Sequence, residues 1–174
     1  MRLIRRATTL LMASTSVQAS TAPPLYDVVV YGASGFTGRL AVEYLTDRYA
    51  TSGLKWAIAG RSRARLEALE AAVPIIVADA TDAASVDAMV AQTKVLLNYA
   101  GSPYITKALP VVEACARHGT HYVDVTGEVA LHRASLDRHD AKAKETGSLI
   151  VHSCGYDSIP SDLGYLLASD AYQA

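Results

Sequence analysis

A glycine-rich loop constrains the fold of this chain most strongly. It follows the β-branched, apolar run Tyr26–Tyr31, which is typical of a strand buried on both faces. After the loop, apolar residues recur at helical spacing. In that context Gly32 permits a tight turn, Gly35 lets a diphosphate approach the backbone, and Gly38 lets the helix pack on the strand. The pattern predicts a dinucleotide-binding loop, the alternative being a tight turn with incidental glycines; its residues are Gly32, Ala33, Ser34, Gly35, Phe36, Thr37 and Gly38.

Five further short apolar runs alternate with helical patterns along the chain. We expect strands at 55–59, 74–78, 94–100, 121–125 and 148–153, with helices between them that include 63–72 and 83–92. This alternation predicts an α/β fold with a doubly wound parallel sheet. Ligands of such sheets bind beyond the carboxyl ends of the strands. Residues 25–174 are therefore expected to form a Rossmann-like dinucleotide-binding domain.

The residues after the expected second strand indicate which dinucleotide the loop would bind. An NAD site needs an acidic residue about 20 positions past the glycine loop, to hold the ribose 2′-hydroxyl. Here Arg61 and Ser62 follow the strand, and no carboxylate occurs before Glu67. Arg61 can pair with a 2′-phosphate, and Ser62 can donate a hydrogen bond to it. We therefore expect NADP rather than NAD, the alternative being a solvated arginine at a helix start.

Polar or small residues also follow the third and fourth expected strands. Asp79 could accept a hydrogen bond from the adenine amino group, or it could cap the next helix. Tyr99, Ala100 and Gly101 end the fourth strand, where the cofactor passes in such folds. The small pair Ala100 and Gly101 suits a close approach. We therefore add these residues to the predicted cofactor site.

Candidate proton donors follow the sixth expected strand. Tyr156 or Asp157 could donate a proton beside a hydride transfer. Asp157 or Ser158 could instead cap the helix that begins near Pro160. After the fifth strand, Glu128 could orient a ribose or be solvated. The residues leave these alternatives open.

Composition excludes several other classes of protein. The chain is 51% hydrophobic with a net charge of −1, so it can fill a core and has no basic excess for nucleic acid. No apolar run approaches the roughly 20 residues that span a bilayer. The two cysteines and five histidines show no ligand spacing, so no metal site is expected.

Residues 1–24 differ from the rest of the chain. They contain three arginines, seven serine or threonine residues and no acid, a composition typical of an organelle transit peptide. A secretory signal, a disordered extension or a start at Met12 are the alternatives. The expected location is therefore the mitochondrion or the cytoplasm, with secretion disfavoured.

Four segments together resemble the saccharopine dehydrogenase-like oxidoreductases, a family that includes trans-acting enoyl reductases of bacterial lipid synthesis. The segments read YGASGFTGRLAVEYL, KWAIAGRSRARLEAL, PVVEACARHGTHYVDVTGE and IVHSCGYDSIPSDLG. The resemblance implies the NADP-binding domain of an oxidoreductase that transfers a hydride to or from a small-molecule or lipid-derived substrate. It also implies contact with a lipid surface, such as a lipid droplet, and a homodimer in a full-length form.

The chain departs from the family pattern in two features that are expected to affect substrate binding. The stretch Gly101–Pro110 lacks the family's aromatic-glycine-glutamate sequence. Family members are also longer and carry a second domain, which contributes much of the substrate pocket and which we expect this chain to lack. A nucleotide-binding or interaction module without turnover, or a non-functional fragment, is therefore the alternative to an oxidoreductase.

Overall fold

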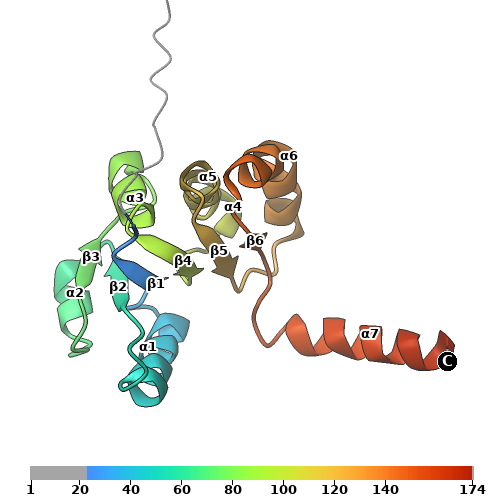
Figure 1. The fold of residues 1–174 in the computed structure, drawn as a ribbon, viewed down its shortest axis with the longest axis horizontal. Helices are drawn as coiled ribbons and strands as arrows, with labels where there is room; N and C mark the ends of the chain where they lie inside the picture. Colours follow the sequence, from blue (N-terminus) through green and yellow to red (C-terminus); the bar gives the residue numbers. More distant parts are fainter. Residues whose placement is uncertain (1–22, 174) are drawn as a thin grey trace, which may run out of the picture.

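Six strands form one all-parallel sheet in the computed structural model, which describes residues 23–173 (Figure 1). The spatial order is β3-β2-β1-β4-β5-β6, so the order reverses between β1 and β4. This confirms the predicted doubly wound sheet, and it places a ligand crevice at the β1–β4 switch point. The strands are β1 (Tyr26–Tyr31), β2 (Trp56–Gly60), β3 (Ile75–Val77), β4 (Thr93–Asn98), β5 (His121–Asp124) and β6 (Ile150–Val151).

Helices cover both faces of the sheet. Figure 1 shows α3, α5 and α6 above the sheet and α1 below it. Neighbouring residues of β1 demonstrate the two layers, because Val29 packs with α3 and α5 whereas Val30 packs with α1 and α2. Both valines are fully buried, as expected for a parallel sheet covered on both sides. The helices are α1 (Phe36–Tyr49), α2 (Arg63–Glu67), α3 (Ala83–Val90), α4 (Tyr104–Lys107), α5 (Leu109–His118), α6 (Val129–Thr146) and α7 (Ile159–Gln173).

Several elements are shorter than the sequence pattern predicted. Helix α2 ends at Glu67 rather than at residue 72, because Glu70 adopts a left-handed conformation that an α-helix does not tolerate. Strand β4 ends at Asn98 rather than at residue 100, since the Asn98 side chain accepts a hydrogen bond from the backbone N–H of Ala100 and turns the chain. Strand β6 covers only two residues of the expected 148–153.

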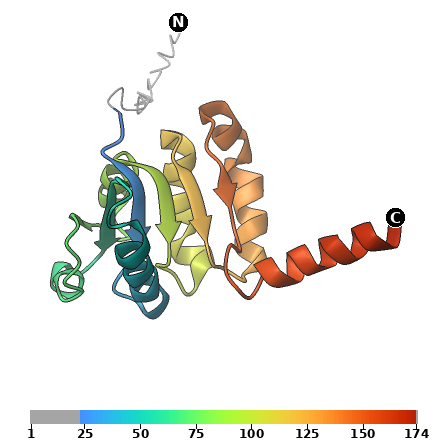
Figure 2. The same cartoon turned by 60° about the horizontal axis from the view of Figure 1, so that its bottom comes forward.

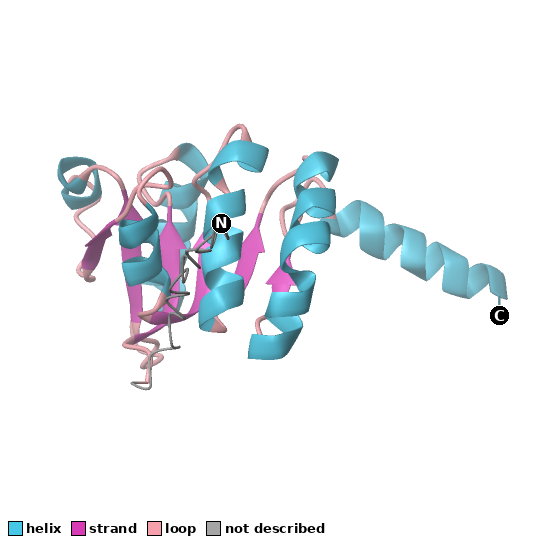
Figure 3. Cartoon of the chain, turned by 90° about the horizontal axis from the view of Figure 1, so that it is seen from above, coloured by secondary structure: helices cyan, strands magenta, loops and turns pink. Residues whose placement is uncertain are grey.

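Helix α7 projects away from the layered body, as Figures 2 and 3 show. None of its described residues is buried, and several large apolar side chains along it are exposed. Among the described residues, no helix is both long and apolar enough to cross a bilayer. Residues 1–22 of the predicted leader lie outside the part of the chain that the structure describes.

The buried β4 side chain Leu96 provides a test of the packing. Leu96→Ala should lower the free energy of unfolding by about 2–5 kcal/mol, because it removes buried methyl groups and leaves a cavity between the sheet and its helices. Urea unfolding followed by circular dichroism measures this loss. The matched control is Leu40→Ala on the exposed side of α1, which should change stability by about 0.5 kcal/mol or less. Equal losses for both variants would contradict the described core.

Candidate cofactor-binding site

The glycine loop makes a tight turn between β1 and α1. Gly32 lies in the left-handed region with a φ of 82°, and a Cβ there would lie 2.5 Å from the backbone nitrogen of Ala100. A Cβ on Gly38 would collide with the carbonyl oxygen of Gly32. Glycine is therefore required at Gly32 by conformation and space, and at Gly38 by the packing of helix on turn. Both match the structural roles predicted from the sequence.

The amino end of α1 faces the carboxyl edge of the sheet without a side-chain cap. Gly35 is the N-cap residue, and within residues 23–173 no side chain accepts a hydrogen bond from the first turn, which also contains no acidic residue. The N–H groups and positive dipole end of this helix are thus free to hold an anion. Phe36 and Thr37 contribute backbone to this turn, and the Phe36 side chain is exposed.

A cavity of about 230 Å³ lies at this edge, over the β1–β4 switch point. Eight of the residues predicted to bind a cofactor line this cavity, and they come from four different loops. They are Gly32, Ser34, Gly35, Arg61, Asp79, Tyr99, Ala100 and Gly101. Five other predicted residues do not line it: Ala33, Phe36, Thr37, Gly38 and Ser62. The cavity lining also includes residues that the prediction missed, among them Arg65, Thr81 and Lys107.

Three cations surround this cavity. Arg61 follows β2 and precedes Ser62, whereas Arg65 lies in the first turn of α2, and both side chains line the cavity. The Arg65 guanidinium donates to the carbonyl of Ser34 in the glycine loop at 3.5 Å. Lys107 donates to the carbonyl of Ser102 at 2.8 Å. The sequence signal that could have identified Arg65 is its position in the first turn of the helix that follows the β2 loop.

Ser62 has a local structural role. Its hydroxyl accepts a hydrogen bond from the backbone N–H of Arg65 at 3.5 Å, and it is the N-cap residue of α2. The serine therefore starts the helix that carries Arg65 toward the glycine loop.

Asp79 lies on the cavity wall and does not cap helix α3. Its carboxylate accepts from the N–H and hydroxyl of Thr81, both at 2.9 Å, whereas Asp82 caps α3 through the N–H of Ala84. The capping alternative for Asp79 is therefore wrong. The two hydrogen bonds from Thr81, with a smaller contribution from the charge of Arg61, lower the pKa of Asp79. Burial raises the pKa of the neighbouring Tyr31 to about 12, and the Asp79 charge adds to this rise, so the phenol stays protonated at neutral pH.

Glu128 holds the start of α4, at the end of the loop that follows β4. Its carboxylate accepts hydrogen bonds from the backbone N–H groups of Tyr104 and Ile105, at 2.7 and 2.9 Å. These groups belong to the first turn of α4. The solvated carboxylate that was one predicted alternative is therefore wrong, and the contact with a ribose stays a prediction.

The predicted proton donors lie apart from the cavity. Tyr156 and Asp157 occupy the loop between β6 and α7, and the Tyr156 side chain is 92% exposed. Neither residue lines the cofactor cavity. Within residues 23–173, no group of three or more histidine, cysteine or acidic side chains is placed to hold a metal ion.

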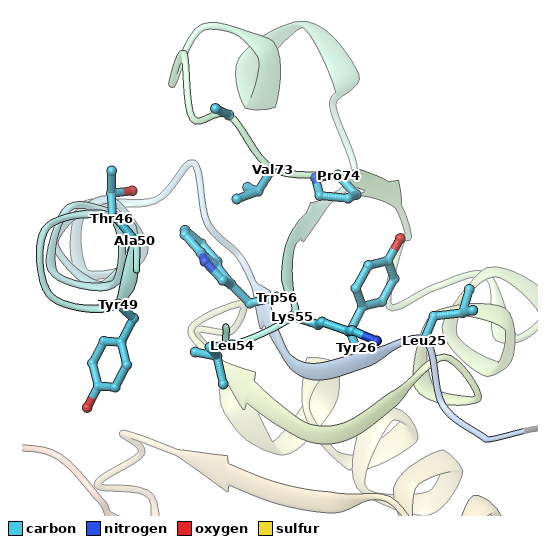
Figure 4. Close-up of a pocket in the computed structure, with 11 residues that line it drawn as sticks. Leu25, Tyr26, Thr46, Tyr49, Ala50, Leu54, Lys55, Trp56, Val73 and Pro74 are labelled. Carbon is cyan, nitrogen blue, oxygen red and sulfur yellow. The ribbon is translucent and has the colours of Figure 1, made fainter. Parts of the chain in front are cut away.

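A larger cavity, of about 500 Å³, lies at the opposite edge of the sheet (Figure 4). It is lined by residues at the amino ends of β1 and β2, such as Tyr26 and Trp56, and by the last turn of α1. Its described lining carries one charged side chain, Lys55, and no helix begins there. Its chemistry therefore does not suit a diphosphate.

Gly38 tests the loop geometry. Gly38→Ala should lower the free energy of unfolding by about 1–3 kcal/mol, because the new Cβ meets the backbone of Gly32 and Ala33 rather than a movable side chain. Chemical denaturation measures the change. Gly127→Ala is the matched control, since a Cβ there has open space around it. An unchanged stability of Gly38→Ala would show that α1 does not pack on the turn as described.

Comparison with known proteins identifies the family. Residues 28–151 match the model of the saccharopine dehydrogenase NADP binding domain. Trans-acting enoyl reductases of Mycobacterium leprae and Mycobacterium bovis are 43% and 42% identical over 145 residues, 79% of this chain and 34% of each relative. The chain thus spans about a third of the length of these curated relatives.

Two solved structures share the fold. One is apo saccharopine dehydrogenase (L-Glu forming) from Saccharomyces cerevisiae, with a TM-score of 0.62 and 24% identity over 76% of this chain and 28% of that chain. The other is Citrobacter sp. triphenylmethane reductase complexed with NADP(H), with a TM-score of 0.55 and 19% identity over 72% of this chain and 48% of that one. Together with the family match, the loop, the sheet order and the arginines establish that this chain belongs to the saccharopine dehydrogenase NADP-binding domain family.

Proposed function

We propose that this chain is the cofactor-binding part of an NADP-dependent oxidoreductase. The observation that carries the proposal is the cavity at the switch point, which combines an uncapped helix end with Arg61 and Arg65 after β2. No carboxylate occupies the position where NAD-binding domains hold the ribose 2′-hydroxyl. Two guanidinium groups at that position match the charge and planar geometry of a 2′-phosphate.

The residues present fit NADP along the whole crevice. The amino end of α1 would hold the diphosphate, since its N–H groups have no side-chain partner in the part of the chain that the structure describes. Arg61 and Arg65 would hold the 2′-phosphate, and Asp79 would accept from the adenine amino group. The nicotinamide end would pass Tyr99–Gly101, which line the cavity next to the Gly32 turn. When bound, the reduced cofactor supplies a hydride.

The substrate class that we propose is a lipid-derived acyl group with a carbon–carbon double bond. The support is the name of the relatives, which are enoyl reductases. Tyr156 and Asp157 stay predictions as proton donors. They follow β6 at the same edge of the sheet as the cofactor loops, and the exposure of Tyr156 leaves its hydroxyl open to a substrate.

An interaction module without turnover is the second candidate. The exposed apolar side chains of α7, including Leu163, Leu166 and Leu167, support it because such a helix face suits contact with a further protein or lipid surface. A homodimer, an association with lipid droplets and a mitochondrial or cytoplasmic location stay predictions.

Removal of the two arginines tests the proposed cofactor preference. Arg61→Ala and Arg65→Ala should each weaken NADPH binding about 10- to 100-fold, since each loses a charge-assisted hydrogen bond worth about 1.5–3 kcal/mol. NADH binding should change little, because NADH has no 2′-phosphate. Titration calorimetry with both dinucleotides measures the two affinities.

Arg63→Ala is the matched control. Arg63 belongs to the same helix, pairs with Glu67 at 3.7 Å and does not line the cavity. Its loss should leave both affinities unchanged. The assignment of the 2′-phosphate site would be refuted if Arg61→Ala weakened the binding of NADPH and of NADH equally. It would also be refuted if Arg63→Ala weakened NADPH binding as much as Arg61→Ala does.

A further inference from the structure

A chain of buried polar side chains crosses three strands at the carboxyl edge of the sheet. The Asn98 amide nitrogen, at the end of β4, donates to the Tyr122 hydroxyl of β5 at 2.9 Å. That hydroxyl donates to a carboxylate oxygen of Asp124 at 2.9 Å, and Nδ1 of His152, beyond β6, lies 2.7 Å from the same oxygen. The first three residues are at most 2% exposed, and the His152 side chain is 10% exposed. The network is therefore almost completely shielded from water.

The carboxylate fixes the direction of these hydrogen bonds. Burial alone would raise the pKa of Asp124, but the hydrogen bond and charge of His152, with donors from Thr126 and Tyr122, outweigh burial and lower it. The ionised carboxylate only accepts hydrogen bonds, so Nδ1 of His152 carries a proton and donates it. The other carboxylate oxygen accepts from the N–H groups of Thr126 and Ser153, both at 3.1 Å.

Aromatic contacts hold the His152 ring in place. The ring stacks on His132 of α6 with centroids 5.0 Å apart, and it lies edge-on to Tyr122 at 5.7 Å. Nε2 of His152 is buried without a hydrogen-bond partner among the described residues. Among the described residues, the hydrogen bond to Asp124 is therefore the one polar contact of this ring.

The other end of the network reaches the cofactor loop. Since the Asn98 amide nitrogen faces Tyr122, its oxygen faces the opposite way and accepts from the N–H of Ala100 at 2.9 Å. That peptide is the one against which a Cβ on Gly32 would collide. Ala100 lines the cofactor cavity, whereas none of the four network residues does.

We propose that Tyr122 and His152 are positioning residues of the cofactor site, which orient Asn98 and thereby hold the Ala100 peptide against the Gly32 turn. This inference rests on the proposed function, since it assigns the loop to a cofactor. The Tyr122 hydroxyl donates its one proton to Asp124, so toward Asn98 it can only accept a hydrogen bond. The amide nitrogen of Asn98, and not its oxygen, must therefore face Tyr122. His152 in turn fixes the carboxylate that accepts from Tyr122.

Tyr122→Phe tests the proposal, because it removes the hydroxyl and keeps the ring. The resonance of the Ala100 amide should shift, and its hydrogen should exchange faster with solvent. NADPH affinity should fall about fivefold, the equivalent of one hydrogen bond of about 1 kcal/mol. Nuclear magnetic resonance of the whole chain and titration with NADPH give the two readouts. Tyr44→Phe, on the exposed face of α1, is the matched control and should change neither.

A pair of His152 variants separates positioning from simple packing. His152→Asn keeps an N–H donor near the place of Nδ1, so the Ala100 amide shift and the NADPH affinity should stay close to those of the unsubstituted chain. His152→Leu has no donor there, so it should shift the Ala100 resonance and weaken NADPH binding as Tyr122→Phe does. The proposal is overturned if Tyr122→Phe leaves the Ala100 resonance unchanged, or if His152→Asn and His152→Leu behave alike. A chain that binds no NADPH would refute the proposed function, while the Ala100 readout would still decide whether Tyr122 and His152 position the loop.

Discussion

The close approach of the Gly32 turn to the Ala100 peptide is the contact on which the rest of the site depends. It occurs where β1 and β4 separate, at the one point of this sheet where the strand order reverses. A Cβ on Gly32 would meet backbone atoms on the other side, so neither loop can give way. The contact brings the amino end of α1, the end of β2 and the loop after β4 around a single cavity. The buried network from Asn98 to His152 reaches the same contact, because the Asn98 oxygen accepts a hydrogen bond from the N–H of Ala100.

Local patterns were sufficient to predict the fold. The apolar run of β1, the glycine spacing and the alternation of strands with helices led to a parallel, doubly wound sheet, and each of these features depends on residues close in sequence. Element ends were less predictable, because single conformations decide them. The left-handed Glu70 ends α2 early, and the Asn98 side chain ends β4, and neither leaves a signal in hydrophobic periodicity.

The part of the site that could not be predicted depends on contacts between distant residues. Glu128 holds the first turn of α4 across 24 positions of sequence, and Asp124 holds His152 across 28. Lys107 lines the same cavity as the glycine loop, although the two are far apart in sequence. Arg65 was within reach of sequence reasoning, since it lies in the first turn of the helix that follows the predicted Arg61 loop. Most of the predicted residues that line the cavity follow strands, whereas the missed cations Arg65 and Lys107 lie on helices.

The central claim is that the carboxyl edge of the sheet, and not the larger cavity at the amino edge, binds the dinucleotide. Amide chemical-shift mapping of the whole chain during titration with NADPH tests this most directly. The account predicts that perturbed residues cluster in 32–38, 61–65, 79–81 and 99–107, with NADH giving weaker changes near Arg61 and Arg65. Perturbations centred on Thr46, Tyr49 and Trp56, or identical maps for the two dinucleotides, would contradict it.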